Sequence, residues 1–480
     1  MPLSACADIL DPNPPQPPTR TRQPAAPAAP QSHTPPPNAA DPAPQNSPTS
    51  QTDTDPALWD VIIVGAGIAG LRAAQILQQN GQRVLLLEAR NRIGGRIYTD
   101  DTTGTPLDLG ASWIHGTRGN PITQIANQQK ATLIPTDYED MQRFDFNGNP
   151  LTDDLGRRTD ALLERYFNWA RQYAEDQNND LSLQAALEVV LRQKPLGARD
   201  LRLLNYALNT NLEHEYAADA SQLSAWYFDE QEEFGREDVI FAQGYRTIVD
   251  ALAQNLEIRL NQVVQRITYD DSGASLNTQS NTLHARAILV TVPLGVLQRG
   301  GITFEPPLPA NKQTALTRVG MGLLNKCYLI FPKVFWDAET LLGYVGERKG
   351  EWAEWLNLDA LLGVPILLGF NAGAYARTLE TQTDAQIVQS AMDTLRQIYG
   401  AEIPQPLDYR ITRWAQDPFA LGSYSFLGVN ATPKDYDTLA QPVGARLFFA
   451  GEHTQRDYPS TVHGAYLSGE RAADQMLSFL

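Results

Sequence analysis

Val61-Ile62-Ile63-Val64-Gly65-Ala66-Gly67-Ile68-Ala69-Gly70 decides how the folded part of this 480-residue chain begins. The apolar residues predict a buried strand, and the glycines predict a tight turn after it. Apolar residues then recur at helical spacing up to Gly81, and a second apolar run, Val84 to Leu87, predicts another strand. The segment therefore has the βαβ form in which a GxGxxG pattern binds a dinucleotide.

Gly65, Gly67 and Gly70 have separate tasks in such a pattern. The first glycine allows the tight turn, the second lets the backbone approach a pyrophosphate, and the third packs the helix on the strand. Free amides at the helix N-terminus add affinity for the phosphates. Glu88 ends the second strand, where a carboxylate accepts hydrogen bonds from an adenosine ribose. These residues predict a dinucleotide cofactor but leave NAD and FAD both open.

A second glycine turn, Arg90-Asn91-Arg92-Ile93-Gly94-Gly95-Arg96, follows directly. Its arginines, Arg90 and Arg96 among them, are suited to bidentate contact with a pyrophosphate. An ordinary basic loop would account for the arginines but not for the paired glycines Gly94 and Gly95. The combination of two glycine turns favours FAD as the cofactor.

Composition restricts the class of protein. A hydrophobic content of 42% suffices for a large core, and the length favours two interleaved domains. The formal net charge of -17 repels nucleic-acid phosphates, so we expect no nucleic-acid partner. No apolar run reaches the roughly 18 residues of a membrane helix, so we expect no transmembrane segment. The cysteines, Cys6 and Cys327, provide neither a disulfide framework nor a thiolate metal site, and we predict no metal.

Residues 1–58 are rich in proline and poor in large apolar residues, which predicts a disordered tail. Within this tail, Leu3-Ser4-Ala5-Cys6 has the form of a lipoprotein cleavage box, but the charged and apolar leader that such a box requires does not precede it. Two localisations follow from these features. The default is cytoplasmic, and the alternative is a periplasmic or lipid-anchored protein, held through Cys6, if translation starts upstream.

Five further blocks extend the pattern, and with them nearly all of residues 59–480 resembles the flavin amine oxidase family. In chain order the blocks are Gly244-Tyr245; Val290-Thr291-Val292-Pro293-Leu294-Gly295-Val296-Leu297; Arg413-Trp414 with Asp417-Pro418 and Gly422-Ser423-Tyr424-Ser425; Phe448-Phe449-Ala450-Gly451-Glu452-His453-Thr454; and Gly464-Ala465-Tyr466-Leu467-Ser468-Gly469.

The resemblance implies an α/β fold in which a Rossmann-like, doubly wound FAD-binding domain is interleaved with an α+β substrate-binding domain. We expect the FAD-binding domain in residues 59–135, 236–305 and 439–480. The substrate-binding domain, with its own mixed sheet and helices, is expected in residues 136–235 and 306–438. Local patterns predict helices over 162–174 and 181–192 and strands over 258–269 and 287–292.

The resemblance also assigns residues to the cofactor. Glu452 is implied to contact the ribityl or pyrophosphate part of FAD, and the amides near Thr461 and Val462 are implied to face the flavin pyrimidine carbonyls. Monoamine oxidases usually attach FAD through a C-terminal cysteine, and Cys327 is not at that place, so FAD is expected to be noncovalent. Further positions implied to line the cofactor are Gly110, Ala111, Ser112, Trp113, Val263, Trp414 and Gly451.

Gly110-Ala111-Ser112-Trp113-Ile114-His115-Gly116 is similar to the polyamine oxidase and histone lysine demethylase branch of the family. L-Amino acid oxidases are expected to have an arginine in this block for the substrate carboxylate, and none lies between Leu107 and Thr117. The demethylases carry a helical N-terminal domain and a long helical hairpin, and the sequence shows neither pattern. The polyamine oxidase branch is therefore favoured.

Lys326 stands within an apolar run that ends at Phe331, where a buried ammonium group is costly. A surface-facing lysine on an edge strand is the alternative that the residues alone leave open. The resemblance implies instead a lysine that holds a water near flavin N5 and assists oxygen reduction or imine hydrolysis. A lowered pKa would suit that role.

His115 and Tyr458 complete the predicted catalytic set with Lys326. His115 matches a substrate-side position of the polyamine branch, where it would hydrogen-bond the amine or help deprotonate it, and a structural histidine is the alternative. Tyr458 and Trp414 match positions beside the flavin, where a ring can flank the amine and attract its cationic form. Tyr424 is predicted to bind substrate as well.

Carboxylates set back from the flavin would suit the distal ammonium groups of a polyamine. Glu215, in Glu213-His214-Glu215-Tyr216, aligns with a polyamine oxidase segment that supplies such a glutamate. Glu232 belongs to the acidic run Asp229-Glu230-Gln231-Glu232-Glu233, for which a solvated loop is the alternative. We predict that Glu215 and Glu232 bind substrate.

The reaction implied by the resemblance is FAD-dependent oxidation of spermidine or spermine. A hydride passes to flavin N5, water hydrolyses the imine to an aldehyde and a shorter amine, and O2 is reduced to H2O2. The alternatives are an L-amino acid oxidase for a basic amino acid, an amine dehydrogenase that uses an acceptor other than oxygen, and a flavin-bound binding protein without activity.

Overall fold

The computed structural model describes residues 58–480 of the chain. The predicted disordered tail, with its Cys6 box, falls on residues 1–57 and so lies outside the described residues, apart from Leu58. No helix within residues 58–480 is long and apolar enough to cross a membrane.

The predicted βαβ opening is confirmed. β1 (Trp59–Val64) and β2 (Val84–Leu87) pair in parallel, and α1 (Ile68–Gln79) connects them. Every residue of these strands except Asp60 is buried, as expected of strands covered on both faces. Gly81 adopts a positive φ just after α1, where a side chain would be strained, and so ends the helix.

Both strands belong to an eight-stranded sheet with the order β13-β10-β11-β12-β1-β2-β9, in which β21 pairs with β12. β12, β1, β2, β9 and β21 are parallel neighbours, whereas β11 pairs with β10 and β12 antiparallel. The predicted strands over 258–269 are confirmed as two short strands, and 287–292 as the end of a longer one. The other members are β9 (Ile258–Arg259), β10 (Arg266–Asp270), β11 (Gly273–Asn277), β12 (Thr282–Val290), β13 (Thr303–Glu305) and β21 (Leu447–Phe449).

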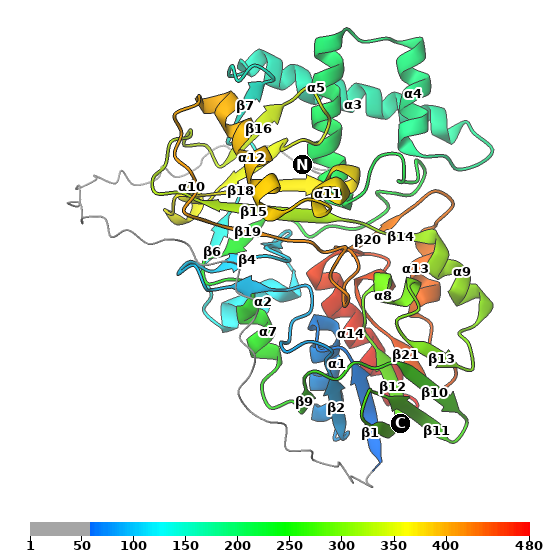
Figure 1. Cartoon of the computed structure of the whole chain (residues 1–480). Coiled ribbons are helices and arrows are strands. Elements are labelled where there is room, and N and C mark those ends of the chain that lie inside the picture. The colour runs from blue at the N-terminus through cyan, green and yellow to red at the C-terminus, as the bar shows by residue number, and fades with distance from the viewer. Residues whose placement is uncertain (1–57) are drawn as a thin grey trace. The chain divides into compact units, whose positions relative to one another are not determined.

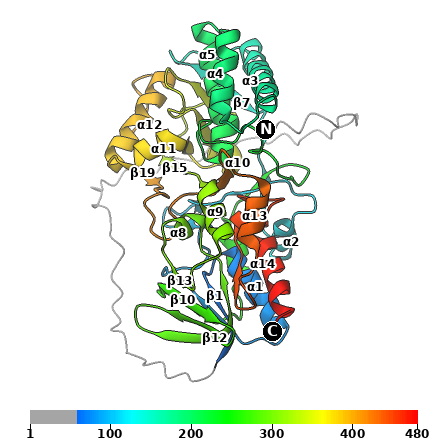
Figure 2. The same ribbon diagram turned by 90° about the vertical axis from the view of Figure 1, so that its right-hand side faces the viewer.

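α14 (Val462–Leu477) packs beside α1, and the two helices appear side by side in Figure 1 and Figure 2. The approach is close because a Cβ on Gly469 would lie 2.3 Å from the carbonyl oxygen of Ala69. An ion pair of 2.6 Å between Arg72 and Glu470 joins the same helices. The first and last helices therefore share one apolar cluster over one face of the large sheet.

A second sheet has six strands in the order β19-β15-β18-β17-β16-β7. All of its pairs are antiparallel except β16 with β7, so the sheet is mixed. β15 is flanked on both sides and is not an edge strand. The strands are β7 (Met141–Asp145), β15 (Leu324–Ile330), β16 (Leu341–Val345), β17 (Glu354–Asn357), β18 (Ile366–Ala372) and β19 (Asp408–Ile411).

Helices cluster near this sheet at the end of Figure 1 away from α1. The helix predicted over 162–174 is confirmed, but it begins earlier because Thr152 caps it and Asp153 and Asp154 suit its positive N-terminus. The helix predicted over 181–192 is confirmed as α4. The helices of this part are α3 (Asp153–Glu175), α4 (Leu183–Gln193), α5 (Ala198–Leu208), a π-helical turn (Asn209–Glu213), α6 (His214–Tyr216), α10 (Leu358–Leu362), α11 (Gly373–Glu380) and α12 (Asp384–Tyr399).

Short elements connect the two large sheets. Three small sheets pair β3 (Thr99–Asp100) with β4 (Leu107–Asp108), β8 (Val239–Phe241) with both β5 (Trp113–Ile114) and β6 (Leu133–Pro135), and β14 (Val319–Met321) with β20 (Ser425–Leu427). The remaining helices are α2 (Pro121–Gln128), α7 (Arg246–Leu252), α8 (Leu294–Gln298), α9 (Ala310–Arg318), α13 (Pro433–Ala440) and a 3-10 turn (Glu452–Thr454). Residues 58–480 form one compact unit, so the predicted domain boundaries stay a prediction.

Candidate active site

Two glycine turns form a cradle. Gly94 forms a parallel bridge with Gly67, and the Gly94 amide donates to the carbonyl oxygen of Ala66 over 2.9 Å. A Cβ on Gly95 would meet nothing closer than the Cα of Gly67, at 3.6 Å, and a Cβ on Gly67 would have no neighbour within 4 Å. Both turns therefore leave open space where side chains would otherwise stand, which fits a pyrophosphate.

The other fingerprint glycines are closely packed. Gly65 has a φ of 111°, and a Cβ on it would lie 2.6 Å from Oγ1 of Thr291. A Cβ on Gly70 would lie 2.2 Å from the carbonyl oxygen of Gly65. These two glycines therefore serve the turn and the contact between helix and strand. Within the described structure α1 has no side-chain cap, so its first amides are free to bind an anion.

Glu88 is buried at the end of β2, where its carboxylate is held by main-chain amides. Oε2 accepts from Ala66 over 2.8 Å and Oε1 accepts from Arg90 over 2.9 Å. Each oxygen keeps a second lone pair, so the carboxylate can still accept ribose hydroxyls. Val263 lies next to this edge, because the preceding amide, of Gln262, donates to the carbonyl oxygen of Glu88.

The arginines of the second turn have different partners. Both terminal nitrogens of Arg90 donate to Asp417, at 2.8 and 2.7 Å, which leaves the N–H of Nε and one N–H on each terminal nitrogen for other acceptors. The bidentate phosphate contact expected of Arg90 would use these remaining donors and stays a prediction. Arg92 donates to the carbonyl oxygen of Gly95 over 2.9 Å and so supports the turn itself. Arg96 reaches across to the C-terminal block.

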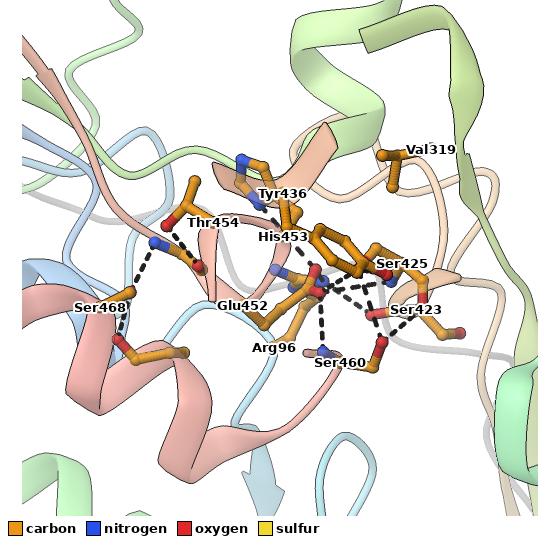
Figure 3. A network of polar contacts seen from close by, with 12 residues as sticks. Arg96, Val319, Ser423, Ser425, Tyr436, Glu452, His453, Thr454, Ser460 and Ser468 are labelled. Carbon is orange, nitrogen blue, oxygen red and sulfur yellow. Dashed lines mark hydrogen bonds and ion pairs between the residues drawn. The ribbon is translucent and has the colours of Figure 1, made fainter. Parts of the chain in front are cut away.

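Glu452 collects donors from separate segments of the chain, as Figure 3 shows. Its Oε1 accepts from Nη1 of Arg96 over 2.8 Å, and its Oε2 accepts from Oγ of Ser425 over 2.6 Å and from the Ser460 amide over 3.2 Å. Burial alone would raise the pKa of this carboxyl, but the charges of Arg96 and, less directly, His453 keep it below its usual value. Glu452 thus joins the second glycine turn to the start of the last helix.

The N-terminus of α14 is organised by its own loop. Thr461 is the N-cap, and its Oγ1 accepts from the Gly464 amide over 2.9 Å. Val462 is the first helical residue, and the contact of the amides near it with the flavin carbonyls stays a prediction. Gly451, with a φ of 134°, donates its amide to Oγ of Ser468 over 2.8 Å. This bond fixes the C-terminal block against α14.

Lys326 is 5% exposed and points from β15 into the segment that joins β4 to β5. Its Nζ donates to the carbonyl oxygens of Asp108, over 2.8 Å, and Gly110, over 2.6 Å, and also to Oγ of Ser112. The surface-lysine alternative is therefore excluded. Burial lowers the pKa of Lys326, and the charge of Asp108 only partly offsets this shift.

Asp108 is a buried acidic partner that the sequence patterns did not single out. Its carboxylate accepts from Oγ1 of Thr99 and from the Tyr245 amide, the latter at 3.0 and 3.1 Å. Burial raises the pKa of Asp108, although the hydrogen bond from Thr99 and the charge of Lys326 work in the opposite direction. The Gly244-Tyr245 block thus holds the segment that receives Lys326.

The predicted aromatic residues Trp113, Trp414 and Tyr424 have different partners. The Trp113 ring lies 5.7 Å from Nζ of Lys326, and Nε1 of Trp414 donates to the carbonyl oxygen of Leu109 over 3.2 Å. Ala111 continues the same segment, with its amide bound to Arg96. The Tyr424 hydroxyl donates to the carbonyl oxygen of His214 over 2.7 Å, so its own proton is already committed.

Tyr458 and Glu232 are brought into contact by the fold. The Tyr458 hydroxyl donates to Oε2 of Glu232 over 3.2 Å. The Tyr458 ring stacks on Phe234 at 4.7 Å with an interplanar angle of 3°, and Phe234 also contacts the His463 ring at 5.1 Å. Glu230, Glu232 and Glu233 are all exposed, so the solvated-loop alternative for the acidic run stands beside this contact.

His115 meets a carboxylate that the sequence analysis missed. Its Nδ1 lies 2.8 Å from Oδ2 of Asp238, while the His115 side chain is 50% exposed. Desolvation works to lower the pKa of His115, but the hydrogen bond and charge of Asp238, followed by the charges of Glu215 and Glu233, raise it overall. Glu215 itself is exposed. The pKa of Tyr424 is raised mainly by the burial of its own hydroxyl and next by the charge of Glu215. The predicted residues His115, Glu215 and Tyr424 therefore share one electrostatic environment.

Comparisons with known proteins agree with this geometry. The family described as flavin containing amine oxidoreductase matches residues 68–477. Polyamine oxidase 2 of Arabidopsis thaliana is 35% identical over 432 residues, which cover 86% of this chain and 87% of that protein. Lysine-specific histone demethylase 1 homolog 1 of Oryza sativa subsp. japonica is 37% identical over 438 residues, which cover 86% of this chain but only 52% of the demethylase homolog. The chain thus spans about half the length of that relative.

A solved structure of a redesigned double mutant of putrescine oxidase has the same fold. It matches with a TM-score of 0.71 at 18% sequence identity and covers 88% of this chain and 99% of its own. The predicted α/β fold with a Rossmann-like FAD-binding region is therefore confirmed. Together with the glycine cradle and the extent of the family match, these findings mean that the chain belongs to the flavin-containing amine oxidase family and is an FAD-dependent, amine-oxidising enzyme.

Proposed function

We propose that the enzyme oxidises a polyamine, spermidine or spermine, with O2 as the electron acceptor. The observation that carries this proposal is the acidic surrounding of His115, in which Asp238 contacts the ring and the charges of Glu215 and Glu233 act on it. A polyamine carries several ammonium groups, so carboxylates along its approach attract it more strongly than a monoamine. The identity of 35% with Polyamine oxidase 2 supports the same substrate class.

When bound, FAD supplies the oxidising chemistry by accepting a hydride from the carbon beside the amine nitrogen. The residues of the chain would place that carbon. Trp414 and Tyr458 offer rings to flank the amine, and Glu215 and Glu232 would attract its distal ammonium groups. Water hydrolyses the imine to an aldehyde and a shorter amine, and we assign the binding of that water to Lys326. The three donors of Lys326 already meet the carbonyl oxygens of Asp108 and Gly110 and Oγ of Ser112, so the water would take the place of one of these acceptors.

We further propose that FAD is held without a covalent bond. Within residues 58–480 the one cysteine is Cys327, which is buried in β15, and burial raises the pKa of its thiol. A thiol in this state is a poor nucleophile. Acid precipitation of the holoenzyme should therefore release all flavin into the supernatant, and flavin that stays with the polypeptide would contradict this proposal.

Peroxide release by the purified holoenzyme tests the substrate and the acceptor together. The panel should contain spermidine, spermine, putrescine, tyramine, arginine and a methylated lysine peptide. We expect the highest kcat/KM for spermidine or spermine. Strong activity on arginine or on the peptide with none on spermidine would overturn the proposed substrate. Turnover of spermidine with a quinone but without peroxide in air would overturn O2 as the acceptor.

Mass spectrometry of the products from spermidine then identifies the carbon that is oxidised. The secondary nitrogen of spermidine has a CH2 group on each side. Oxidation of one or the other CH2 group releases a different aldehyde. Asp437→Asn serves as a control variant, because Asp437 pairs with Arg456 in an exposed ion pair and belongs to none of the contacts described around Lys326 or His115. It should match the wild type in product and rate.

A further inference from the structure

We propose that Asp238 is a positioning residue that fixes the tautomer of His115, so that Nε2 of His115 accepts the proton of the bound ammonium group. This inference rests on the proposed function as an amine oxidase acting on cationic amines. Hydride loss requires a neutral amine nitrogen, whereas alkylamines are protonated near neutral pH because their pKa resembles that of lysine, about 10.4. A base beside the amine would let the enzyme use the abundant ammonium form.

The register of a small sheet brings the two residues together. β5 pairs antiparallel with β8 in the register Trp113 with Ile240 and Ile114 with Val239. The next position along this register places His115 opposite Asp238. β6 adds to the same edge, since the Thr136 amide donates to the carbonyl oxygen of Asp238 over 2.9 Å. The contact is thus built into the backbone and does not depend on a mobile side chain alone.

The hydrogen bonds of Asp238 leave one tautomer for the neutral imidazole of His115. Oδ1 accepts from the Gly116 amide over 2.8 Å. Oδ2 accepts from the Tyr138 hydroxyl over 3.0 Å and lies 2.8 Å from Nδ1 of His115. An ionised carboxylate only accepts hydrogen bonds, and the pKa of Asp238 is lowered overall, because the hydrogen bond and charge of His115 outweigh its burial. The proton of neutral His115 therefore sits on Nδ1, and Nε2 presents its lone pair.

The proposed function puts the substrate amine beside His115. Two residues before it, the Trp113 ring lies 5.7 Å from Nζ of Lys326, so β5 joins the lysine to the histidine. The half-exposed ring of His115 can receive a proton on Nε2 as the N–H bond of the ammonium breaks, and can then release that proton to solvent. The positive charge of the imidazolium is meanwhile held by Asp238.

Other titratable groups also face His115, and their effects differ in sign. Glu215 and Glu233 raise its pKa, as Asp238 does. His463 lies behind it, with Asn120 donating to the carbonyl oxygen of His115 and contacting Nδ1 of His463. Burial, and then the charge of His115, lower the pKa of His463 to about 3, so His463 stays neutral and does not compete for the proton.

Asp238→Asn is a sharp test because the Gly116 amide decides how the new side chain is oriented. The amide oxygen must face Gly116, so the NH2 group faces Nδ1 of His115 as a donor. His115 then carries its proton on Nε2, which can no longer accept one. The loss of the negative charge also lowers the pKa of His115.

The first readout is the tautomer itself. We suggest 15N–1H NMR of the histidine rings in the holoenzyme, with the signal of His115 assigned by its loss in His115→Gln. The wild type should show the Nδ1–H tautomer and Asp238→Asn the Nε2–H tautomer. This measurement needs no substrate, so it stays informative if the enzyme oxidises no polyamine and the proposed function fails. An Nε2–H tautomer in the wild type, or no change in Asp238→Asn, would overturn the inference.

The second readout is the pH profile of kcat/KM with the best amine of the panel. Loss of a general base typically costs about 100-fold or more, so we expect a fall of that order in Asp238→Asn, with the acid limb shifted to lower pH. Asp238→Glu, which keeps the carboxylate, should recover part of the rate. Asp140→Asn is the matched control, because Asp140 accepts from Thr340 instead of a histidine, and it should leave the profile unchanged. A merely structural role for Asp238 would lower the rate without moving the limb, and that result would contradict the inference.

Discussion

Glu452→Gln should destabilise the enzyme strongly although it changes almost no volume. The wild-type carboxylate accepts hydrogen bonds on both oxygens, from Arg96 on Oε1 and from Ser425 and Ser460 on Oε2 (Figure 3). An amide has one accepting oxygen and one donating NH2 group. In either orientation of the glutamine, the NH2 group faces a donor that cannot reverse its role, either the guanidinium of Arg96 or the main-chain amide of Ser460.

The magnitude follows from burial. The Glu452 side chain is only 5% exposed and that of Arg96 is 22% exposed, so solvent cannot replace the lost acceptor fully. Removing one partner of a buried ion pair costs about 3–5 kcal/mol, and a hydrogen bond to a charged group contributes about 1.5–3 kcal/mol. Since glutamine keeps one of the two accepting faces, we expect the free energy of unfolding to fall by about 3 kcal/mol.

Asp437→Asn provides the matched control. Asp437 also pairs with an arginine, Arg456, at 3.2 Å, but both side chains are 48% exposed. Exposed pairs contribute about 0.2–1 kcal/mol, so this variant should lose less than about 1 kcal/mol. The comparison separates the burial of the pair from the mere presence of an ion pair.

Urea unfolding of the holoenzyme at one fixed excess of FAD measures both variants, since bound ligand adds to stability by mass action. The pH dependence gives a further check. The pKa of Glu452 is lowered in the folded state, so its contribution is complete above the unfolded value of about 4.3 and is lost as the pH falls through the folded value. A Glu452→Gln variant within about 1 kcal/mol of Asp437→Asn would refute the reasoning.

Two other sites give expectations of the same kind. Gly67→Ala should fold normally but retain less FAD, because its Cβ would meet no protein atom within 4 Å and would enter the cradle. Gly70→Ala should instead lower the melting temperature, because its Cβ would lie 2.2 Å from the carbonyl oxygen of Gly65. The ratio of flavin to protein absorbance and a thermal scan distinguish the two, and equal flavin content in Gly67→Ala and wild type would contradict the assignment. Burial, with the charge of Arg471 next, lowers the pKa of Lys312 to about 7, so the unfolded chain binds more protons between about pH 7 and about pH 10. The wild type should therefore gain stability relative to Lys312→Met as the pH rises through this range, and a flat difference in urea unfolding would count against it.

The parts of the fold that sequence patterns predict are those set by local signals. The strands and helix of the βαβ opening follow from apolar periodicity and glycine spacing, and the cradle of Gly67, Gly94 and Gly95 follows from their order along the chain. The start of α3 is also predictable from the sequence, since Thr152 followed by Asp153 and Asp154 is an N-terminal capping signal.

Long-range pairing accounts for what the patterns did not predict. Arg90 and Asp417 are 327 residues apart, so no local feature shows that this aspartate binds the guanidinium of Arg90. β7 pairs in parallel with β16, and such a register is set by tertiary packing and not by either segment alone. In the sequence, Asp238 is one more acidic residue after the run 229–233, and nothing local distinguishes it. Only the antiparallel register of β5 with β8 places it at His115. Asp108 was likewise unremarkable until the fold put it beside Lys326.

The central claim is that this chain removes a hydride from a polyamine, and rapid anaerobic mixing of the holoenzyme with spermidine or spermine tests it most directly. Without oxygen, the visible absorbance of the flavin should bleach in a single rapid phase and return when air is admitted, with one equivalent of peroxide formed. Tyramine, which has a single amino group, should bleach the flavin much more slowly. A flavin that stays oxidised with both polyamines while another amine bleaches it would contradict the account.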